Sequence, residues 1–183
     1  MKKTMMMFLL MAACLLAGCG RKKESQEGTA EGFRNDVAPQ AVVEAVAAEL
    51  GEDYWADAEI PPEYLSDIYG VSEDMYEEAY AQMPMISANI DTLIVVKAAE
   101  ESVEDVQNAL NTYKEAMAQD TFQYPVNIPK IQASEVAVYG NYVCFVQLGA
   151  DMNGEVDDEE AMITACQDMN ARALDVIKRE LTE

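Results

Sequence analysis

The sequence predicts an α+β domain in which two N-terminal helices are followed by two ββα units. Apolar residues recur at helical spacing near the start of the domain, and two pairs of apolar runs flank turn-forming residues. Each of these pairs precedes a further segment with helical periodicity. A four-stranded antiparallel sheet with its helices packed on one face is the simplest arrangement that buries these stripes.

The first two helices are expected at residues 39–50 and 61–70. Pro39 suits the first turn of a helix, and Gly51 ends the apolar period that follows it. Leu65 and Ile68 are expected to point inward from the second helix. The apolar positions of the first helix are Val42, Val43, Val46, Ala47 and Leu50.

The first ββα unit is predicted from residues 75–85, the β-branched run at 92–98 and a helix that begins near Ser102. Pro84 donates no hydrogen bond, so it is expected on an edge strand or at a bulge. Ser102 and Asp105 have the spacing of a capping box. The apolar stripe of this helix is Val103, Val106, Leu110, Tyr113 and Met117.

The second ββα unit follows residues 119–129, which are expected to form a loop fixed by two prolines. Apolar residues alternate on both sides of Gly140-Asn141, a pair that favours a tight hairpin turn. The last helix is predicted to begin in 157–163 and to end in 177–181. Its acids then lie at the positive end of the helix dipole and its bases at the negative end.

The N-terminal segment has the order of a secretory leader, with two lysines before twelve apolar residues at 5–16. Twelve residues are too few to span a bilayer core, which needs about 20. Leu16-Ala17-Gly18-Cys19 resembles the lipobox of bacterial lipoproteins. This resemblance implies cleavage before Cys19 and a diacylglyceryl group on its sulfur; two acyl chains anchor a protein stably. An ordinary secretory leader is the alternative.

The domain organisation expected from these patterns has three parts. Residues 1–18 form the signal peptide, residues 19–38 form the lipidated cysteine and a flexible polar tether, and residues 39–183 form a single acidic domain. The expected location is the extracytoplasmic side of the cell membrane, with the membrane as a partner through the lipid on Cys19.

Composition excludes several classes of function. The net charge is −22, which disfavours nucleic-acid binding because phosphate backbones are repelled. The chain contains no histidine, so the Ser-His-Asp and Cys-His arrangements and the commonest zinc ligand are missing. GxGxxG, P-loop and CxxC motifs are missing as well. We therefore expect no cofactor, no metal site and no catalytic residues.

Residues 75–183 resemble a family of bacterial lipoproteins, domain of unknown function 4358 (DUF4358). The resemblance rests on "DTLIVVKA", "SVEDVQNALNTYKEAMAQD", "YPVNIPKIQASEV" and above all "VYGNYVCFVQLGAD". These stretches are patterns of packing and turns rather than of chemistry. The resemblance implies a lipid-anchored extracytoplasmic domain and identifies no catalytic residue.

Two further features have competing interpretations. The acidic run at 151–160 suggests calcium, but Gly154 follows Asn153 directly, which departs from the calcium-loop spacing, so a first-turn charge set is favoured. Cys144 and Cys166 fall within apolar patterns and are expected to be buried and reduced, while a disulfide between them stays open as an alternative.

The candidate partner surface consists of aromatic residues, because amphipathic rings dominate many interfaces. Adjacent carboxylates such as Glu77-Glu78 leave a small hydrolase of envelope or extracellular glycans as the alternative function, although neighbours in sequence do not face each other. The preferred hypothesis is a non-catalytic module that binds an envelope protein or glycan. The aromatic residues are Tyr54, Trp55, Tyr64, Tyr69, Tyr76 and Tyr80.

Overall fold

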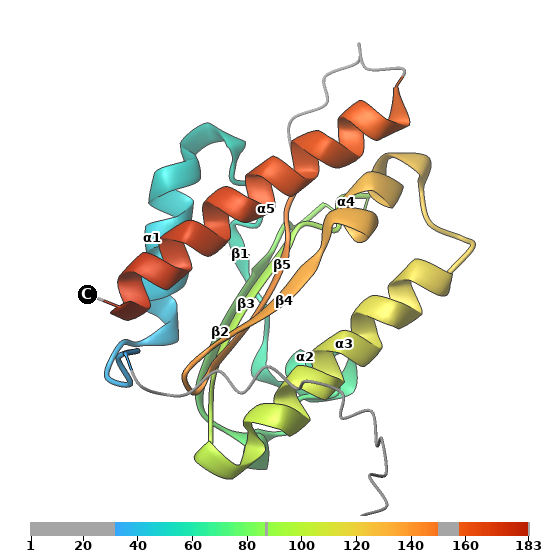
Figure 1. The fold of residues 1–183 in the computed structure, drawn as a ribbon. Coiled ribbons are helices and arrows are strands. Elements are labelled where there is room, and N and C mark those ends of the chain that lie inside the picture. Colours follow the sequence, from blue (N-terminus) through green and yellow to red (C-terminus); the bar gives the residue numbers. More distant parts are fainter. Residues whose placement is uncertain (1–31, 87, 150–157, 183) are drawn as a thin grey trace, which may run out of the picture.

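The computed structural model describes residues 32–86, 88–149 and 158–182, which form helices and strands in one body (Figure 1). Among these residues, no helix is both long enough and apolar enough to cross a membrane. The elements are α1 (Pro39–Leu50), η1 (Gly51–Asp53), β1 (Ala58–Glu59), α2 (Pro62–Asp67), η2 (Glu73–Met75), β2 (Tyr76–Met83), β3 (Thr92–Ala98), η3 (Glu100–Ser102), α3 (Val103–Gln119), η4 (Pro125–Asn127), α4 (Ile128–Ala133), β4 (Glu135–Tyr139), β5 (Tyr142–Gln147) and α5 (Glu159–Thr182).

The strands form one antiparallel sheet in the order β1-β2-β3-β5-β4. Both predicted hairpins are confirmed, because β2 pairs with β3 and β4 pairs with β5. The prediction of four strands was wrong by one. Residues 58–59 add a fifth strand beside β2, and two residues are too short a segment to show the alternation that reveals a strand in sequence.

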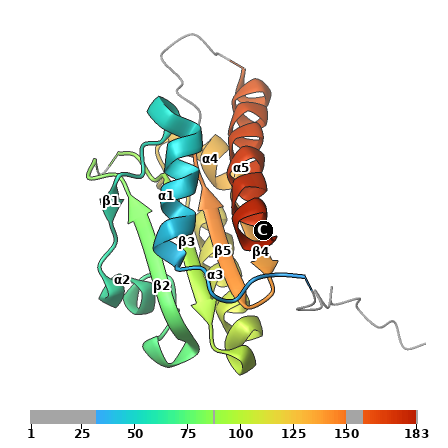
Figure 2. The same cartoon turned by 90° about the vertical axis from the view of Figure 1, so that its left-hand side faces the viewer.

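The helices cover both faces of the sheet, which corrects the expectation that they pack on one face only. Figure 2 shows α1 and α5 side by side in front of the strands and α3 behind them. The short α2 lies beside β2, and its Leu65 joins the core on the α3 side. Leu93 and Val95 of β3 join the core under α1 and α5. Ile94 and Val96 of the same strand join the core under α2 and α3.

The two central strands explain why a single helical layer is insufficient. Positions Leu93 to Val96 of β3 and Tyr142 to Val146 of β5 are all fully buried. A strand buried on both faces has a continuous apolar run, whereas a strand with one solvated face alternates. Burial of each large aliphatic side chain contributes about 1.5–3 kcal/mol, so leaving either face of this pair uncovered would be costly.

Several local predictions need correction. Leu65 is buried as expected, but Ile68 is 49% exposed, because α2 ends at Asp67 and Ile68 does not continue its inward stripe. Ser102 is the N-cap of α3, but its side chain makes no capping hydrogen bond, so the predicted capping box is not formed. Pro84 follows the last residue of β2 instead of lying in an edge strand, and the bulge of β2 occurs between Tyr76 and Glu78. The expected loop at 119–129 contains η4 and the first residues of α4.

Part of the expected tether packs against the domain. The ring of Phe33 meets that of Tyr139 edge to face at a centroid distance of 5.6 Å. The Tyr142 hydroxyl donates to the Val37 carbonyl at 2.7 Å and accepts from the Val37 N–H at 3.1 Å. The Arg34 N–H donates to the Leu181 carbonyl at 2.7 Å. The chain therefore enters the domain beside the β4–β5 turn and the end of α5.

Gly140 in that turn has a backbone requirement and a steric one. Its φ is 61°, a conformation that favours glycine, and a Cβ there would lie 3.1 Å from Phe33 Cβ. The turn predicted from Gly140-Asn141 thus forms and also seats the incoming chain.

Cys144 and Cys166 are both fully buried, as expected. Cys144 on β5 is a free thiol, so it is not joined to Cys166 on α5. Burial raises the pKa of the Cys144 thiol to about 12. Such a thiol is a core residue with little thiolate at neutral pH and not a reactive group.

We expect the domain to lose stability as the pH rises above about 9. Burial raises the pKa of Tyr139 to about 12, as it does for Cys144, whereas both ionise near 8.5–10 in an unfolded chain. Their stabilising contribution is complete below the unfolded pKa and is lost as the pH approaches the folded pKa. Urea unfolding followed at pH 8 and pH 11 should show this fall, and Tyr139→Phe should reduce it. An unchanged unfolding free energy across this range would contradict the assignment.

Candidate functional site

Two long connections meet at the end of the sheet where β2 stops and β3 begins, here called the apical end. They are residues 84–91, between β2 and β3, and residues 120–133, which run from the end of α3 through α4. The Asn127 side-chain amide donates to the Ala88 carbonyl at 3.1 Å. Lys130 Nζ donates to Asn89 Oδ1 at 2.7 Å and to Asp91 Oδ1 at 2.6 Å. The connections are therefore fastened to each other.

The ion pair between Lys130 and Asp91 is buried. The exposed fractions of the two side chains are 9% and 1%. Burial raises the pKa of Asp91, and the Lys130 ammonium opposes this rise by favouring the carboxylate. Gly149 supplies the space for the lysine, because a Cβ at that position would collide with Lys130 Cε.

Two more buried side chains hold the surrounding backbone. The Gln147 amide donates to the Ile90 carbonyl at 2.8 Å. Asn170 of α5 accepts from the Leu148 N–H at 2.9 Å and donates to the Ala133 carbonyl at 2.8 Å. Asp91 Oδ2, Asn127 Oδ1 and Gln147 Oε1 are buried acceptors that receive no hydrogen bond from the described part of the chain.

This polar cluster is a structural clamp by position and chemistry. Asp91 and Lys130 are both buried beneath the surface, and their hydrogen bonds join the two connections. Within residues 32–86, 88–149 and 158–182, no group of three or more cysteine, aspartate or glutamate side chains is placed to hold a metal ion. What the clamp does is fix the loops above it.

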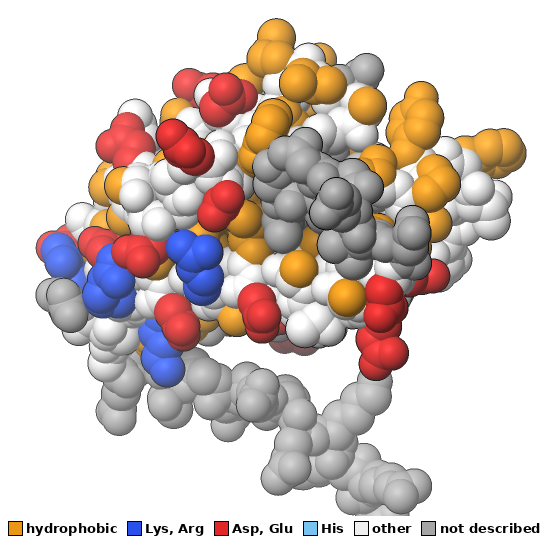
Figure 3. All heavy atoms as spheres, turned by 90° about the horizontal axis from the view of Figure 1, so that it is seen from above, with side chains coloured by type: hydrophobic (Ala, Val, Ile, Leu, Met, Phe, Trp, Pro, Cys, Tyr) orange, Lys and Arg blue, Asp and Glu red, His pale blue; other side chains and the backbone are white. Residues whose placement is uncertain are grey.

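The fixed loops present large apolar side chains to solvent. Phe122 is 93% exposed and Met85 is 85% exposed, values that are unusual for such residues in a rigid framework. Figure 3 views this end, and hydrophobic side chains gather at the top and right of the view. We call the exposed set the apical surface; it consists of Met85, Ile86, Phe122, Tyr124, Val126 and Ile128.

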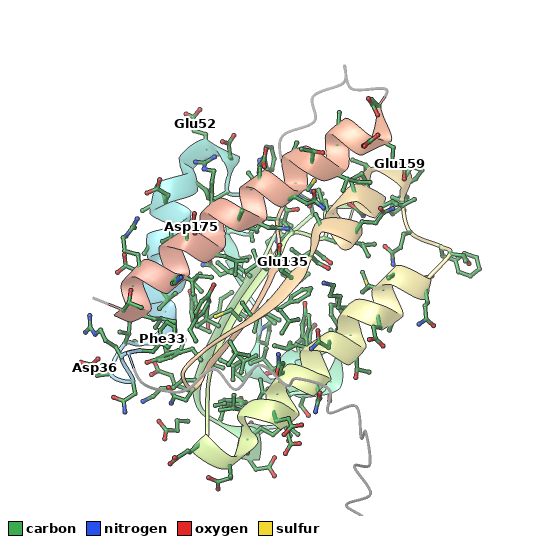
Figure 4. All side chains as sticks on the ribbon, viewed as in Figure 1. Phe33, Asp36, Glu52, Glu135, Glu159 and Asp175 are labelled. Atoms are coloured by element: carbon green, nitrogen blue, oxygen red, sulfur yellow. The ribbon has the colours of Figure 1, made fainter. Side chains whose placement is uncertain are left out.

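Acidic side chains accompany the apical surface. Asp120 lies two residues before Phe122, and its carboxylate accepts from the Phe122 N–H at 2.9 Å and from the Gln123 amide at 2.8 Å. Exposed Glu159 and Glu160 begin α5, which packs against α4. Figure 4 shows Glu159 at the upper right, at the start of α5, whereas Glu52 lies on the opposite side of the view.

The six aromatic residues predicted as one partner surface are dispersed. Tyr54 and Tyr80 pack against the core beneath α1 and α5, whereas Tyr69 and Tyr76 belong to the opposite core. Tyr69 is 4% exposed, so its assignment to a surface is corrected; its ring packs 4.5 Å from that of Tyr113.

Trp55 and Tyr64 remain exposed, at 43% and 42%. Tyr54 is half-buried, and its hydroxyl donates to Gln82 Oε1 at 2.8 Å. The partner role of the exposed rings stays a prediction.

The other predicted features are placed as follows. The lipobox Leu16-Ala17-Gly18-Cys19 and residues 151–157 of the acidic run lie outside the described residues. Asp158 accepts from the Glu160 N–H at 3.1 Å at the start of α5, as expected for a first-turn charge set. Glu77, from one of the paired-carboxylate candidates, forms an ion pair with Lys97 at 2.8 Å.

Sequence reasoning missed the apical surface because it treated residues 119–129 only as a connection. The available signal was a set of large apolar side chains inside a proline-containing loop, with no partner strand in sequence to cover them. Whether neighbouring elements bury such residues depends on the path of the loop, which periodicity does not describe.

The fold and this end define a class: a sheet domain covered by helices on both faces, with a clamped apolar surface at one end. The chain belongs to the family described as "Domain of unknown function (DUF4358)", whose model matches residues 53–148. The match includes both apical connections and ends before α5. It begins and ends earlier in the chain than the resemblance at 75–183 that the sequence analysis describes. The chain matches no curated protein and no solved structure.

Replacement of Lys130 tests the clamp. We expect Lys130→Met to lower the free energy of unfolding by roughly 3–5 kcal/mol, because Asp91 is left buried without its cation. Lys97→Met is the matched control: it breaks an ion pair whose Glu77 carboxylate is exposed, and should cost about 1 kcal/mol or less.

The pH dependence of the Lys130→Met deficit gives a second readout. The pKa of Asp91 is higher in the folded protein than in the unfolded chain. Its contribution to stability is therefore complete at a pH below the unfolded pKa, and it is lost as the pH rises through the folded pKa. The difference in unfolding free energy between Lys130→Met and the unchanged protein should therefore become smaller as the pH is lowered, because Asp91 becomes protonated. Equal losses in the two lysine variants, with no pH dependence, would show that Asp91 and Lys130 are not coupled.

Proposed function

We propose that this protein is a lipid-anchored, extracytoplasmic binding module without catalytic activity, and that its apical surface docks a protein of the cell envelope. The single observation that supports this function most is the exposure of six large apolar side chains on clamped loops. Monomeric proteins rarely expose such sets unless they bind a partner there. Because the loops are fastened beforehand, docking incurs little ordering entropy.

The route of the chain supports the anchored arrangement. Residues from Phe33 to Val37 enter at the β4–β5 turn, which lies at the other end of the sheet from the apical surface. Cys19 and Gly32 are thirteen positions apart in the sequence. An extended chain of that length spans at most about 45 Å. A lipid on Cys19 would thus hold the domain close to the membrane by one end and leave the apical surface free for a partner.

Lipidation is tested by Cys19→Ala. We expect this variant to leave the membrane fraction or to remain uncleaved, because the cysteine sulfur is the acceptor of the diacylglyceryl group in the proposed pathway. Membrane fractionation and metabolic labelling with an alkyne-tagged fatty acid measure this. A variant that is cut at the same bond and stays firmly membrane-bound would contradict the lipid anchor.

Docking is tested by site-specific photo-crosslinking in intact cells. A photoreactive amino acid at Phe122 should capture a discrete partner, while the same group at Glu101, near the start of α3, should not. Phe122→Ser/Tyr124→Ser should lose the partner, because buried aromatic anchors typically contribute about 2 kcal/mol or more to an interface.

Trp55→Ser/Tyr64→Ser is the matched double control, since it also removes two exposed rings and tests the aromatic surface predicted from the sequence. Circular dichroism verifies that both double variants fold. Partner loss in the Trp55/Tyr64 variant alone would assign docking to that surface, and partner retention in both variants would refute the apical assignment.

A further inference from the structure

The apical surface is apolar and acidic, and this combination restricts the chemistry of its partner. The two connections that form it, residues 84–91 and 120–133, contain one basic residue, Lys130. Its ammonium forms the buried ion pair with Asp91 and therefore contributes no exposed positive charge. Asp120, Glu159 and Glu160 are exposed at the same end.

Two positive charges of the domain lie at the other end of the sheet. Arg34 lies beside the β4–β5 turn and interacts with Asp36, and Lys97 at the other end of β3 is paired with Glu77. In Figure 3, the visible Lys and Arg side chains lie to the left, away from the hydrophobic ones on the right. A partner with acidic flanks would be repelled here, because like charges across an interface are unfavourable.

From this arrangement, and on the basis of the proposed docking function, we infer that the occupant of the apical surface is a cationic amphipathic segment of a partner protein. Its apolar side chains would cover Phe122, Tyr124 and Met85, and its lysines or arginines would face Asp120 and the first turn of α5. Apolar contact supplies most of the affinity, while the charges supply orientation and rate of association.

The test uses two synthetic helical peptides with identical leucine positions, one with lysine and one with glutamate at every polar position. Full-length lipidated protein in phosphatidylcholine nanodiscs is titrated against each labelled peptide, and binding to empty nanodiscs is subtracted. We expect the lysine peptide to bind about tenfold more tightly than the glutamate peptide, and to weaken as salt is added.

Variants locate the binding. Phe122→Ser/Tyr124→Ser should weaken the lysine peptide by about tenfold or more. Asp120→Asn/Glu159→Gln/Glu160→Gln should weaken it by roughly fivefold. Glu100→Gln/Glu101→Gln/Glu104→Gln neutralises three acids around the start of α3 and should change the affinity by less than about twofold.

Equal binding of the two peptides would overturn the inference, because no electrostatic attraction would then be present. Equal loss of affinity in the two neutralised variants would also overturn it, because the attraction would then belong to the whole acidic surface. If Phe122 still captures a partner in cells, that result would leave the docking function standing. If crosslinking at Phe122 captures no discrete partner, both the docking function and the cationic partner are refuted. The failure of the inference alone can therefore be distinguished from the failure of the docking function.

Discussion

The pairing of β3 with β5, both buried on two faces, is the constraint on which the rest of this structure depends. Consecutive side chains of β3 enter opposite cores, and the same is true of β5. Neither helical layer can be omitted without exposing half of these side chains to water. The long α5 and the N-terminal α1 are therefore as necessary to the sheet as the two helices of the other face. The family match nevertheless stops before α5.

Because helices cover both faces of the sheet, its loops lie at the two ends. The two ends are organised differently. At the β4–β5 turn, a tyrosine hydroxyl and an aromatic contact hold the incoming chain against the domain. At the apical end, a buried lysine fastens two connections from beneath, and the side chains above it remain uncovered. One end serves attachment of the chain, and the other displays a surface.

The free-energy cost of the clamp is related to the exposure of the apical surface. A buried ion pair is an expensive way to hold a loop, because desolvation of two charges offsets much of their attraction. An apolar core beneath these loops would be an alternative source of stability, but it would draw Phe122 or Met85 inward. A polar clamp holds the backbone while leaving the large apolar side chains outside. In the docking function that we propose, the acidic residues around them select the charge of the partner.

The sequence by itself determined the local elements, because a hairpin turn, a helical stripe and a helix stop are each encoded within about ten residues. The residues from Thr92 to Ala98, the turn at Gly140 and the stripe of α3 were all recognisable. Only the tertiary structure decided that helices cover both faces, that Lys130 reaches Asp91 across 39 positions of chain, and that Phe122 stays uncovered while Tyr69 is buried. The physical reason is that burial and long-range pairing depend on which segments meet, and periodicity along one segment does not contain the identity of its neighbours.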